Sequence, residues 1–313
     1  MARIIEEALV EPLARLLLGV ADVDDGPTDE QIGVLRAIIA GCGGRTDIDV
    51  ASLDPLAPAD AADLIRAPGA RRRSRELMVL LELCRHPLSD AQVARVDEYA
   101  AALGESGPGL EMARDLVRSG AESAQAGFFR FYGSHAHDVA ERSLRDRYHG
   151  DLAGPDAELG DRLRALHDLP AGTLAYAYVE FYRRSGIPLP GGDPHSPAIF
   201  VGHDMCHVIA GYEPIGVDEI ALGAMQLTSA DNDSHWMQFL GNLAVHEAGF
   251  VGSGDIVPKQ VSLARPGATD TLAHAMWRGT QYTGDFTTAD HLARADCPLE
   301  DVRAEFGVPA RIC

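Results

Sequence analysis

Two histidines and two acidic residues stand close together in the second half of the chain. His203, Asp204 and His207 fall within five residues, and Glu219 follows twelve residues after His207. In a helix, His203 and His207 lie on one face about one turn apart, which is the spacing that a divalent metal ion needs of two nitrogen ligands. Imidazole and carboxylate ligands together suit iron, zinc, manganese or cobalt better than magnesium or calcium, which prefer oxygen ligands. The pattern therefore predicts a transition-metal site.

The surrounding sequence indicates which elements position these residues. We expect one helix over residues 198–211, ended by Gly211, and a second helix that starts after Pro214 and Gly216. Glu219 cannot reach the ion along a single helix, because twelve residues rise about 18 Å whereas metal–ligand bonds are about 2.0–2.2 Å. The chain must turn back, which places Glu219 in the first turn of the second helix, facing the histidines.

These residues resemble the coenzyme Q (ubiquinone) biosynthesis protein 4 family, whose signature is His-Asp-x-x-His, eleven residues and Glu. The segments Leu169–Leu174 and Asp218–Leu222 are also similar to family segments, and the resemblance covers about residues 123–313. It implies oxidative removal of a carboxyl group from a phenolic ring that carries a polyprenyl tail. It also implies four metal ligands, namely His203, Asp204, His207 and Glu219.

The chain departs from that family in two places. The first hundred or so residues have no counterpart in the family's usual members, and residues 188–200 match poorly where an isoprenoid tail would be held. His195 falls in this second segment, just before the metal helix, but we do not expect it to be a ligand. The family's ring chemistry can therefore apply to this chain even where the family's substrate does not.

A further helix is expected over residues 234–250. His235, Asn242 and His246 fall along one side of it, seven and eleven residues apart. Such a line is typical of a solvated face, and the alternative is contact with a substrate or support of the metal ligands. We take His246 and the following Glu247 as the candidate catalytic residues in that second interpretation.

Composition excludes several classes of protein. A formal net charge of -20 with a single lysine, Lys259, argues against nucleic-acid binding, which needs clustered basic residues. The basic run Arg71–Arg75 is expected to be a solvated helix face paired with nearby acidic residues. No glycine fingerprint for a nucleotide cofactor and no Gly-x-Ser-x-Gly nucleophile motif occurs. Any catalysis is therefore expected to depend on the metal.

The cysteines and apolar segments indicate the compartment. Five cysteines without a Cys-x-x-Cys pair fit reduced thiols in a cytoplasm, and Cys206 is expected to pack in the core. The longest apolar stretch near the start, Leu16–Ala21, is too short to span a bilayer. We expect a cytoplasmic homo-oligomer without a transmembrane segment, and peripheral contact with a membrane stays open.

Apolar residues recur at helical spacing through most of the chain, which predicts an all-α protein. Capping patterns at Thr28–Gln31 and Ser89–Gln92 mark two helix starts. The run from Arg75 to Gly104 is similar to helical domains of the tellurite-resistance, or TerB-like, type. We expect two packed helical domains, residues 1–122 and 123–313, with the metal site between consecutive helices of the second.

Other elements are expected as follows. Two helices cover residues 57–66 and 70–85, a loop or short strand covers 251–267, and two helices complete the chain.

The sequence leaves three functions open. The leading hypothesis is a metal-dependent enzyme that acts on a phenolic or quinone-like ring, by oxidative decarboxylation or hydroxylation, in quinone or natural-product biosynthesis. The second is a noncatalytic scaffold, in which the metal joins two helices and a cavity holds a prenylated or polyketide-like ligand for partner enzymes. The third is a metal-dependent phosphohydrolase, in which His203 and Asp204 are joined by Asp231 or Asp233.

Overall fold

The computed structural model describes residues 5–147, 156–191, 198–252 and 257–311. These residues form helices joined by loops, and the described ranges contain no β-strand beyond one isolated bridge between Thr173 and Pro298. The predicted all-α class is confirmed. His195 lies outside the described residues.

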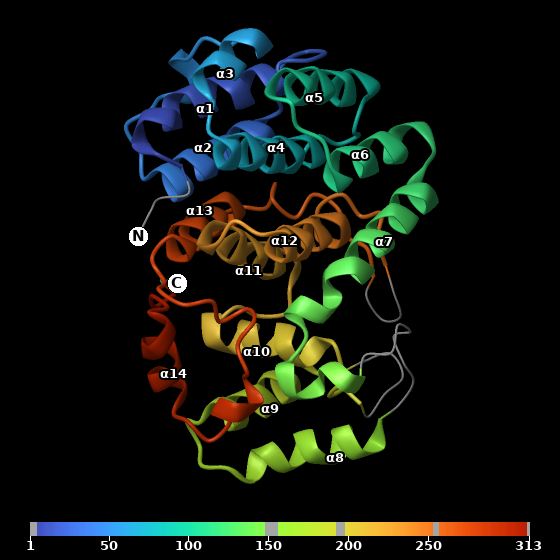
Figure 1. The fold of residues 1–313 in the computed structure, drawn as a ribbon, viewed down its shortest axis with the longest axis vertical. Helices are drawn as coiled ribbons and strands as arrows, with labels where there is room; N and C mark the ends of the chain where they lie inside the picture. Colours follow the sequence, from blue (N-terminus) through green and yellow to red (C-terminus); the bar gives the residue numbers. More distant parts are fainter. Residues whose placement is uncertain (1–4, 148–155, 192–197, 253–256, 312–313) are drawn as a thin grey trace.

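Figure 1 shows the helices stacked in three tiers along the longest axis of the molecule. The top tier contains α1 (Glu7–Ala21), α2 (Asp29–Gly43), α3 (Pro58–Leu64), α4 (Pro68–Leu83), α5 (Asp90–Leu103) and α6 (Pro108–Arg118). The middle tier contains α11 (Gly216–Ser229), α12 (Asp233–His246) and α13 (Ala268–Gly279). The bottom tier contains α8 (Ala157–Ala165), α9 (Leu174–Ser185), α10 (Phe200–Ala210) and α14 (Leu299–Phe306).

One long helix, α7 (Ala121–Val139), runs along the side of the molecule from the top tier to the bottom tier (Figure 1). Short 3-10 helices occupy Val50–Ser52, Arg142–Arg147, Leu166–Asp168 and Leu292–Arg294. The predicted domain boundary near residue 122 falls in the first turn of α7, and the division into two domains stays a prediction.

The helix starts in the top tier follow from the predicted caps. Thr28 and Gln31 form the full capping box, in which each side chain accepts a hydrogen bond from the main-chain N–H of the other residue. Ser89 caps α5 by accepting from Gln92 N–H, but the Gln92 side chain does not bond back. Its amide donates instead to the main-chain oxygen of Val20, at 2.8 Å. In the second predicted capping box, a tertiary hydrogen bond to Val20 therefore replaces the bond from the Gln92 side chain to the Ser89 main chain.

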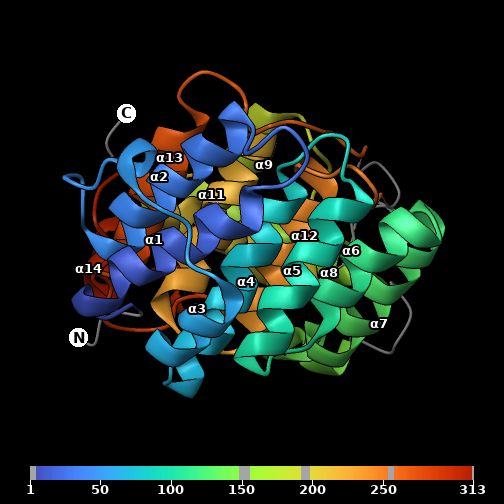
Figure 2. The same cartoon turned by 90° about the horizontal axis from the view of Figure 1, so that it is seen from above.

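Close helix contact joins the top tier to the middle tier. Seen from above in Figure 2, α2 lies over α13, and α4 over α12. A side chain at Gly41 of α2 would place its Cβ 2.5 Å from the main-chain oxygen of Ala273 in α13. On the far side of α13, a Cβ at Gly279 would lie 2.1 Å from the main-chain oxygen of Met225 in α11. Glycine at both positions lets α13 pack tightly between α2 and α11.

The buried apolar residues form clusters that follow the stacking of the tiers. One buried cluster runs continuously from α1 and α2 in the top tier to α11, α12 and α13 in the middle tier, so the two predicted domains share a core. A second cluster fills the bottom tier around α9, α10 and α14. Cys206 of α10 is fully buried in this second cluster, which confirms it as a packing residue. The polar site described below lies where α10 meets α11.

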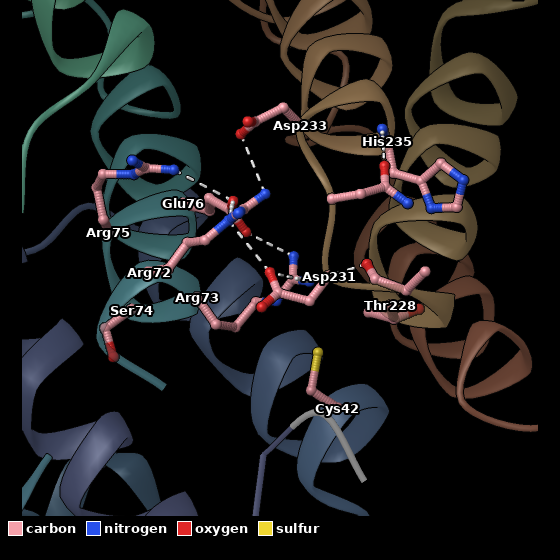
Figure 3. Close-up of polar contacts among 12 residues, drawn as sticks. Cys42, Arg72, Arg73, Ser74, Arg75, Glu76, Thr228, Asp231, Asp233 and His235 are labelled. Atoms are coloured by element: carbon pink, nitrogen blue, oxygen red, sulfur yellow. Dashed lines mark hydrogen bonds and ion pairs between the residues drawn. The ribbon is translucent and has the colours of Figure 1, made fainter. Parts of the chain in front are cut away.

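The basic run at the start of α4 differs from the expected solvated face. Its predicted acidic partners are present, since Arg73 pairs with Glu76 at 2.6 Å and Arg72 pairs with Asp231 at 3.1 Å. Arg73, however, is only 1% exposed, so solvation was the wrong prediction for this side chain. Figure 3 shows the reason, because Arg72 and Arg73 reach from α4 to the loop that joins α11 to α12. The run connects two tiers.

Candidate metal centre

The turn between α10 and α11 has the predicted form. Gly211 ends α10 in the left-handed conformation, with φ 76°, and its N–H donates to the main-chain oxygen of His207 at 2.7 Å. The Asp218 carboxylate accepts a hydrogen bond from Glu213 N–H and pairs with Arg311 at 2.7 Å, which holds the turn closed. Helix α11 begins at Gly216, so Glu219 lies in its first turn.

The structure brings three of the four predicted ligands to one point. Glu219 Oε2 lies 3.1 Å from His207 Nε2 and 3.3 Å from His203 Nε2, and the two Nε2 atoms are 3.1 Å apart. Three ligands bound to one ion at about 2.0–2.2 Å would be separated by similar distances. The geometry of these atoms therefore fits a single cation between α10 and α11.

Hydrogen bonds at the far side of each ring orient the Nε2 atoms. His207 Nδ1 lies 3.1 Å from the main-chain oxygen of Tyr212, which can only accept, so Nδ1 carries the proton when the ring is neutral. His203 Nδ1 lies 3.2 Å from Gln238 Oε1, which favours the same tautomer. Both rings then direct an Nε2 lone pair toward the Glu219 carboxylate, an arrangement that a cation would stabilise.

Asp204, the fourth predicted ligand, lies beside the histidines. It offers a ligand atom within 4.8 Å of ligand atoms from both His203 and His207. Its side chain is buried, and its Oδ2 accepts a hydrogen bond from the Tyr182 hydroxyl of α9. Asp204 can therefore complete the ligand set, with Tyr182 holding its orientation.

The pKa values show how strongly the ligands interact without an ion. Burial raises the pKa of Asp204 to about 8, although the charge of His207 opposes the change. Burial would lower the pKa of His207, but the charge and hydrogen bond of Glu219 raise it to about 9. Burial would raise the pKa of Glu219, and the two histidines hold it well below its usual range instead. A divalent ion would replace these protons as the compensating charge.

A cavity of about 480 Å³ opens beside these residues. Its walls are mostly apolar, and His203, Asp204 and Glu219 lie at its surface. Its lining residues come mainly from α7, α10 and α12, and include Phe128, Phe129, Tyr132, Val139, Ile199, Phe200, Met237 and Val245. Pockets of this size and character commonly hold small apolar molecules with a few polar groups.

The polar residues that were predicted to form one line on α12 lie in different environments. His235 is fully buried and pairs with Asp285 at 3.3 Å, so the solvated interpretation was wrong for this residue. Asn242 lines the cavity and donates to the main-chain oxygen of Glu219 at 2.6 Å. His246 also lines the cavity; its Nδ1 is buried without a hydrogen-bond partner, and burial lowers its pKa. The structure brings Asn242 and His246 to the candidate centre, but not His235.

Glu247 is placed elsewhere. Helix α12 ends at His246 rather than at residue 250, because the chain turns at Glu247 and Gly249 has φ 68°. Glu247 points to His86, 2.7 Å away, and it is not among the residues that line the cavity. The candidate catalytic pair is therefore split, with only His246 beside the candidate metal ligands.

The predicted partners of a phosphohydrolase site are also remote. Asp231 and Asp233 follow the end of α11 at Ser229, whereas Glu219 lies in its first turn, and the ten residues of helix between Glu219 and Ser229 rise about 15 Å. Both aspartates pair with Arg72 of α4 instead (Figure 3). The structure does not bring them to His203 and Asp204.

Three residues of the site were missed in the sequence. Gln238 supports His203, Tyr182 supports Asp204, and Lys259 lines the cavity. Gln238, Asn242 and His246 are spaced four residues apart, so a search for polar residues at that helical spacing would have found Gln238. Lys259 was noted only as the single lysine, and Tyr182 carries no local signal because α9 reaches Asp204 through tertiary packing.

Comparison with known proteins gives little further information. No protein-family model matches the chain, and no curated protein matches it. One similar solved structure is a "Putative ubiquinone biosynthesis protein" from Nostoc punctiforme, at 17% identity and a TM-score of 0.34, covering 76% of this chain and 99% of that one. A TM-score this low does not establish a common fold. Within the described residues, no helix combines the length and apolar character needed to cross a membrane.

Proposed function

We propose that this protein is a metal-dependent enzyme that acts on a phenolic or quinone-like ring, by oxidative decarboxylation or hydroxylation with dioxygen as oxidant. The observation that carries the proposal is that two imidazoles and two carboxylates converge beside a largely apolar cavity of about 480 Å³, with His203, Asp204 and Glu219 at its surface. In a scaffold whose ion only joined two helices, the candidate ligands would have no need to face the cavity, as His203, Asp204 and Glu219 do.

His203, Asp204, His207 and Glu219 would hold the ion. A transition-metal ion bound there would act as a Lewis acid, which stabilises negative charge that develops on a bound ring or its substituents. Two histidines with carboxylates and open coordination positions also suit iron in oxygen-dependent enzymes. The resemblance at the His-Asp-x-x-His and Glu signature supports the same type of reaction.

The cavity residues suggest how a substrate would be bound. Aromatic side chains of α7, Phe128 and Tyr132, would pack against an aromatic ring. His246 lines the cavity, so its imidazole would hydrogen-bond a ring hydroxyl and accept its proton. Lys259 lines the cavity and is exposed, so it lies near the mouth and would attract a carboxylate.

The mouth of the cavity also fits an apolar substituent. Phe129, Ile187 and Val257 line the cavity and are at least 37% exposed, which is unusual for large apolar side chains. Together they would cover a tail that extends from the ring. The substrate class that fits best is therefore a carboxylated or hydroxylated aromatic ring with an apolar chain.

Oxygen consumption tests the proposal directly. The protein is stripped of metal, reloaded with Fe²⁺, and mixed with a carboxylated dihydroxyphenol under air, while dissolved oxygen and carbon dioxide are measured. We expect oxygen uptake that Glu219→Gln abolishes. The matched control is Glu213→Gln, in the turn before α11, where Glu213 pairs with Arg184 away from the cavity.

Two other results would overturn the proposal, and each would favour a different function. Phosphate release from nucleotides without oxygen uptake would favour a phosphohydrolase. Tightly bound zinc with neither activity would favour the noncatalytic scaffold that holds a prenylated or polyketide-like ligand.

A further inference from the structure

A second group of side chains that are of the types found in metal sites lies where the top tier meets the middle tier. Glu30 of α2, His86 after α4 and Glu247 at the end of α12 each offer a ligand atom, and these atoms all lie within 4.8 Å of one another. His86 Nε2 is 2.7 Å from Glu247 Oε1. None of the three residues lines the cavity of the candidate metal centre. This group, the inter-tier cluster, is therefore separate from the first.

The inter-tier cluster places a fully buried carboxyl group, Glu247, beside a half-buried one, Glu30. Glu247 is fully buried, and its Oε2 accepts a hydrogen bond from Leu263 N–H at 2.8 Å, which leaves Oε1 facing His86. Glu30 Oε1 is buried without a hydrogen-bond partner. Burial and the neighbouring Glu247 carboxyl raise the pKa of Glu30 to about 8, although a main-chain hydrogen bond at Ala264 opposes the change. Buried carboxyl groups in contact are costly unless a positive charge compensates them.

Within the described residues, no arginine or lysine forms an ion pair that would compensate these two carboxyl groups. Glu247 forms an ion pair with His86, and among the described residues no ion pair joins an arginine or lysine to Glu30 or Glu247. Elsewhere between the same tiers, the buried Glu76 is surrounded by Arg72, Arg73 and Arg75 (Figure 3). The contrast indicates that a charge from outside the chain belongs beside Glu30 and Glu247.

We propose that Glu30, His86 and Glu247 bind one divalent transition-metal ion, such as Zn²⁺, which joins the top tier to the middle tier. One imidazole nitrogen and two carboxylate oxygens are ordinary zinc ligands, and three protein ligands leave a position for water. The ion offsets the two carboxylate charges and leaves the imidazole neutral. Because the ligands come from α2 and from the segments that follow α4 and α12, far apart in sequence, binding stabilises the contact between these three helices.

Metal stoichiometry separates this site from the first. Metal-free protein is titrated with Co²⁺, which replaces Zn²⁺ and gives a visible spectrum, and Zn²⁺ content is measured after gel filtration. We expect two equivalents in the natural protein and one equivalent in His86→Gln and in Glu30→Gln. Glu219→Ala should also retain one equivalent, with the spectrum of the inter-tier cluster. The double variant Glu30→Gln with Glu219→Ala should retain none.

His167→Gln is the matched control, because His167 also contacts a glutamate, Glu180 at 2.6 Å, outside both clusters. It should keep both equivalents. Circular dichroism verifies that each variant is folded before its metal content is compared. If the natural protein binds one equivalent and His86→Gln binds the same, His86 and Glu247 form a plain ion pair and the proposal is wrong. Two equivalents in both proteins would equally overturn it.

Discussion

His246 and Glu247 are adjacent in sequence but face two different polar sites. His246 lines the cavity beside Glu219, whereas Glu247 contacts His86 at the junction of the top and middle tiers. The last turn of α12 therefore borders both sites. Since each site has its own ligand residues, substitutions can test the two separately.

Loss of a ligand should empty the candidate metal centre without unfolding the protein. His207→Ala and Glu219→Ala each remove an atom from the group of three that lie 3.1–3.3 Å apart. We expect each variant to lack the equivalent of metal held by the natural protein at this centre, while circular dichroism shows unchanged helix content. Metal analysis after dialysis measures the loss. Retention of that equivalent by both variants would show that the ligand assignment is wrong.

Tyr182→Phe should weaken metal binding while leaving all four ligands in place. The Tyr182 hydroxyl donates to Asp204 Oδ2, and such supporting hydrogen bonds typically contribute about 10- to 100-fold in metal affinity. We expect a loss in that range, measured by competition with a chromophoric chelator. Tyr176→Phe is the control, because Tyr176 lies on the same helix and stacks on His167 instead. Equal affinity in Tyr182→Phe and the natural protein would remove Asp204 from the ligand set.

Lys259→Met should reduce affinity for carboxylated ligands only. Its ammonium group is exposed at the cavity, so the attraction is partly screened, and we expect roughly a five- to tenfold rise in Kd. An uncharged ring of the same shape should bind equally to both proteins. Isothermal titration at low and high salt measures this, and the difference should shrink as salt increases. A similar weakening for the uncharged ring would show that Lys259 acts by packing.

Glu82→Gln should stabilise the protein at neutral pH. Burial raises the pKa of Glu82 well above its usual value, and the charge of Asp97 adds to this, although Arg114 opposes it. A carboxyl group whose pKa is raised by folding contributes stability below its unfolded pKa, and that contribution is lost as pH rises toward the folded pKa. The variant should therefore have a higher urea midpoint than the natural protein at pH 8, and a smaller advantage at pH 4.

The exposed Glu111 provides the control for that pH dependence, because Glu111→Gln removes a carboxylate from the same tier without removing a buried one. Its midpoint should follow the natural protein at both pH values. A constant difference between Glu82→Gln and the natural protein across this range would mean that packing, rather than ionisation, explains the effect.

The sequence predicted the local features of this protein better than its long-range contacts. Gly211 and Gly216 mark the turn that brings Glu219 to His207, because helix ends depend on residues close in sequence. The contact between Glu247 and His86 could not be predicted, since 161 positions separate the two residues. The burial of Arg73 was missed for the same reason: its surroundings include the loop between α11 and α12, which no helical pattern in α4 reveals.

Arg73 provides a final test of how the tiers are joined. It is 1% exposed and pairs with Glu76 at 2.6 Å (Figure 3), so its removal leaves the buried Glu76 carboxylate with only the longer pairs to Arg72 and Arg75, at 3.3 Å each. We expect Arg73→Met to lower the free energy of unfolding by about 1–3 kcal/mol, because the two remaining arginines still compensate part of the Glu76 charge. Arg72→Met should cost less, because Arg72 is partly exposed and its pairs with Asp231 and Asp233 are solvated. Urea denaturation measures both.

The double variant Arg73→Met with Glu76→Leu distinguishes lost pairing from lost packing. If the loss of the buried ion pair is the cause, the double variant should regain part of the stability lost in Arg73→Met, because no buried carboxylate is then left without its nearest partner. If the double variant is less stable than either single variant, the arginine side chain contributes mainly through its packing and its hydrogen bond to the main-chain oxygen of Ala230 at 3.2 Å. The basic run would then join the tiers by contact rather than by charge.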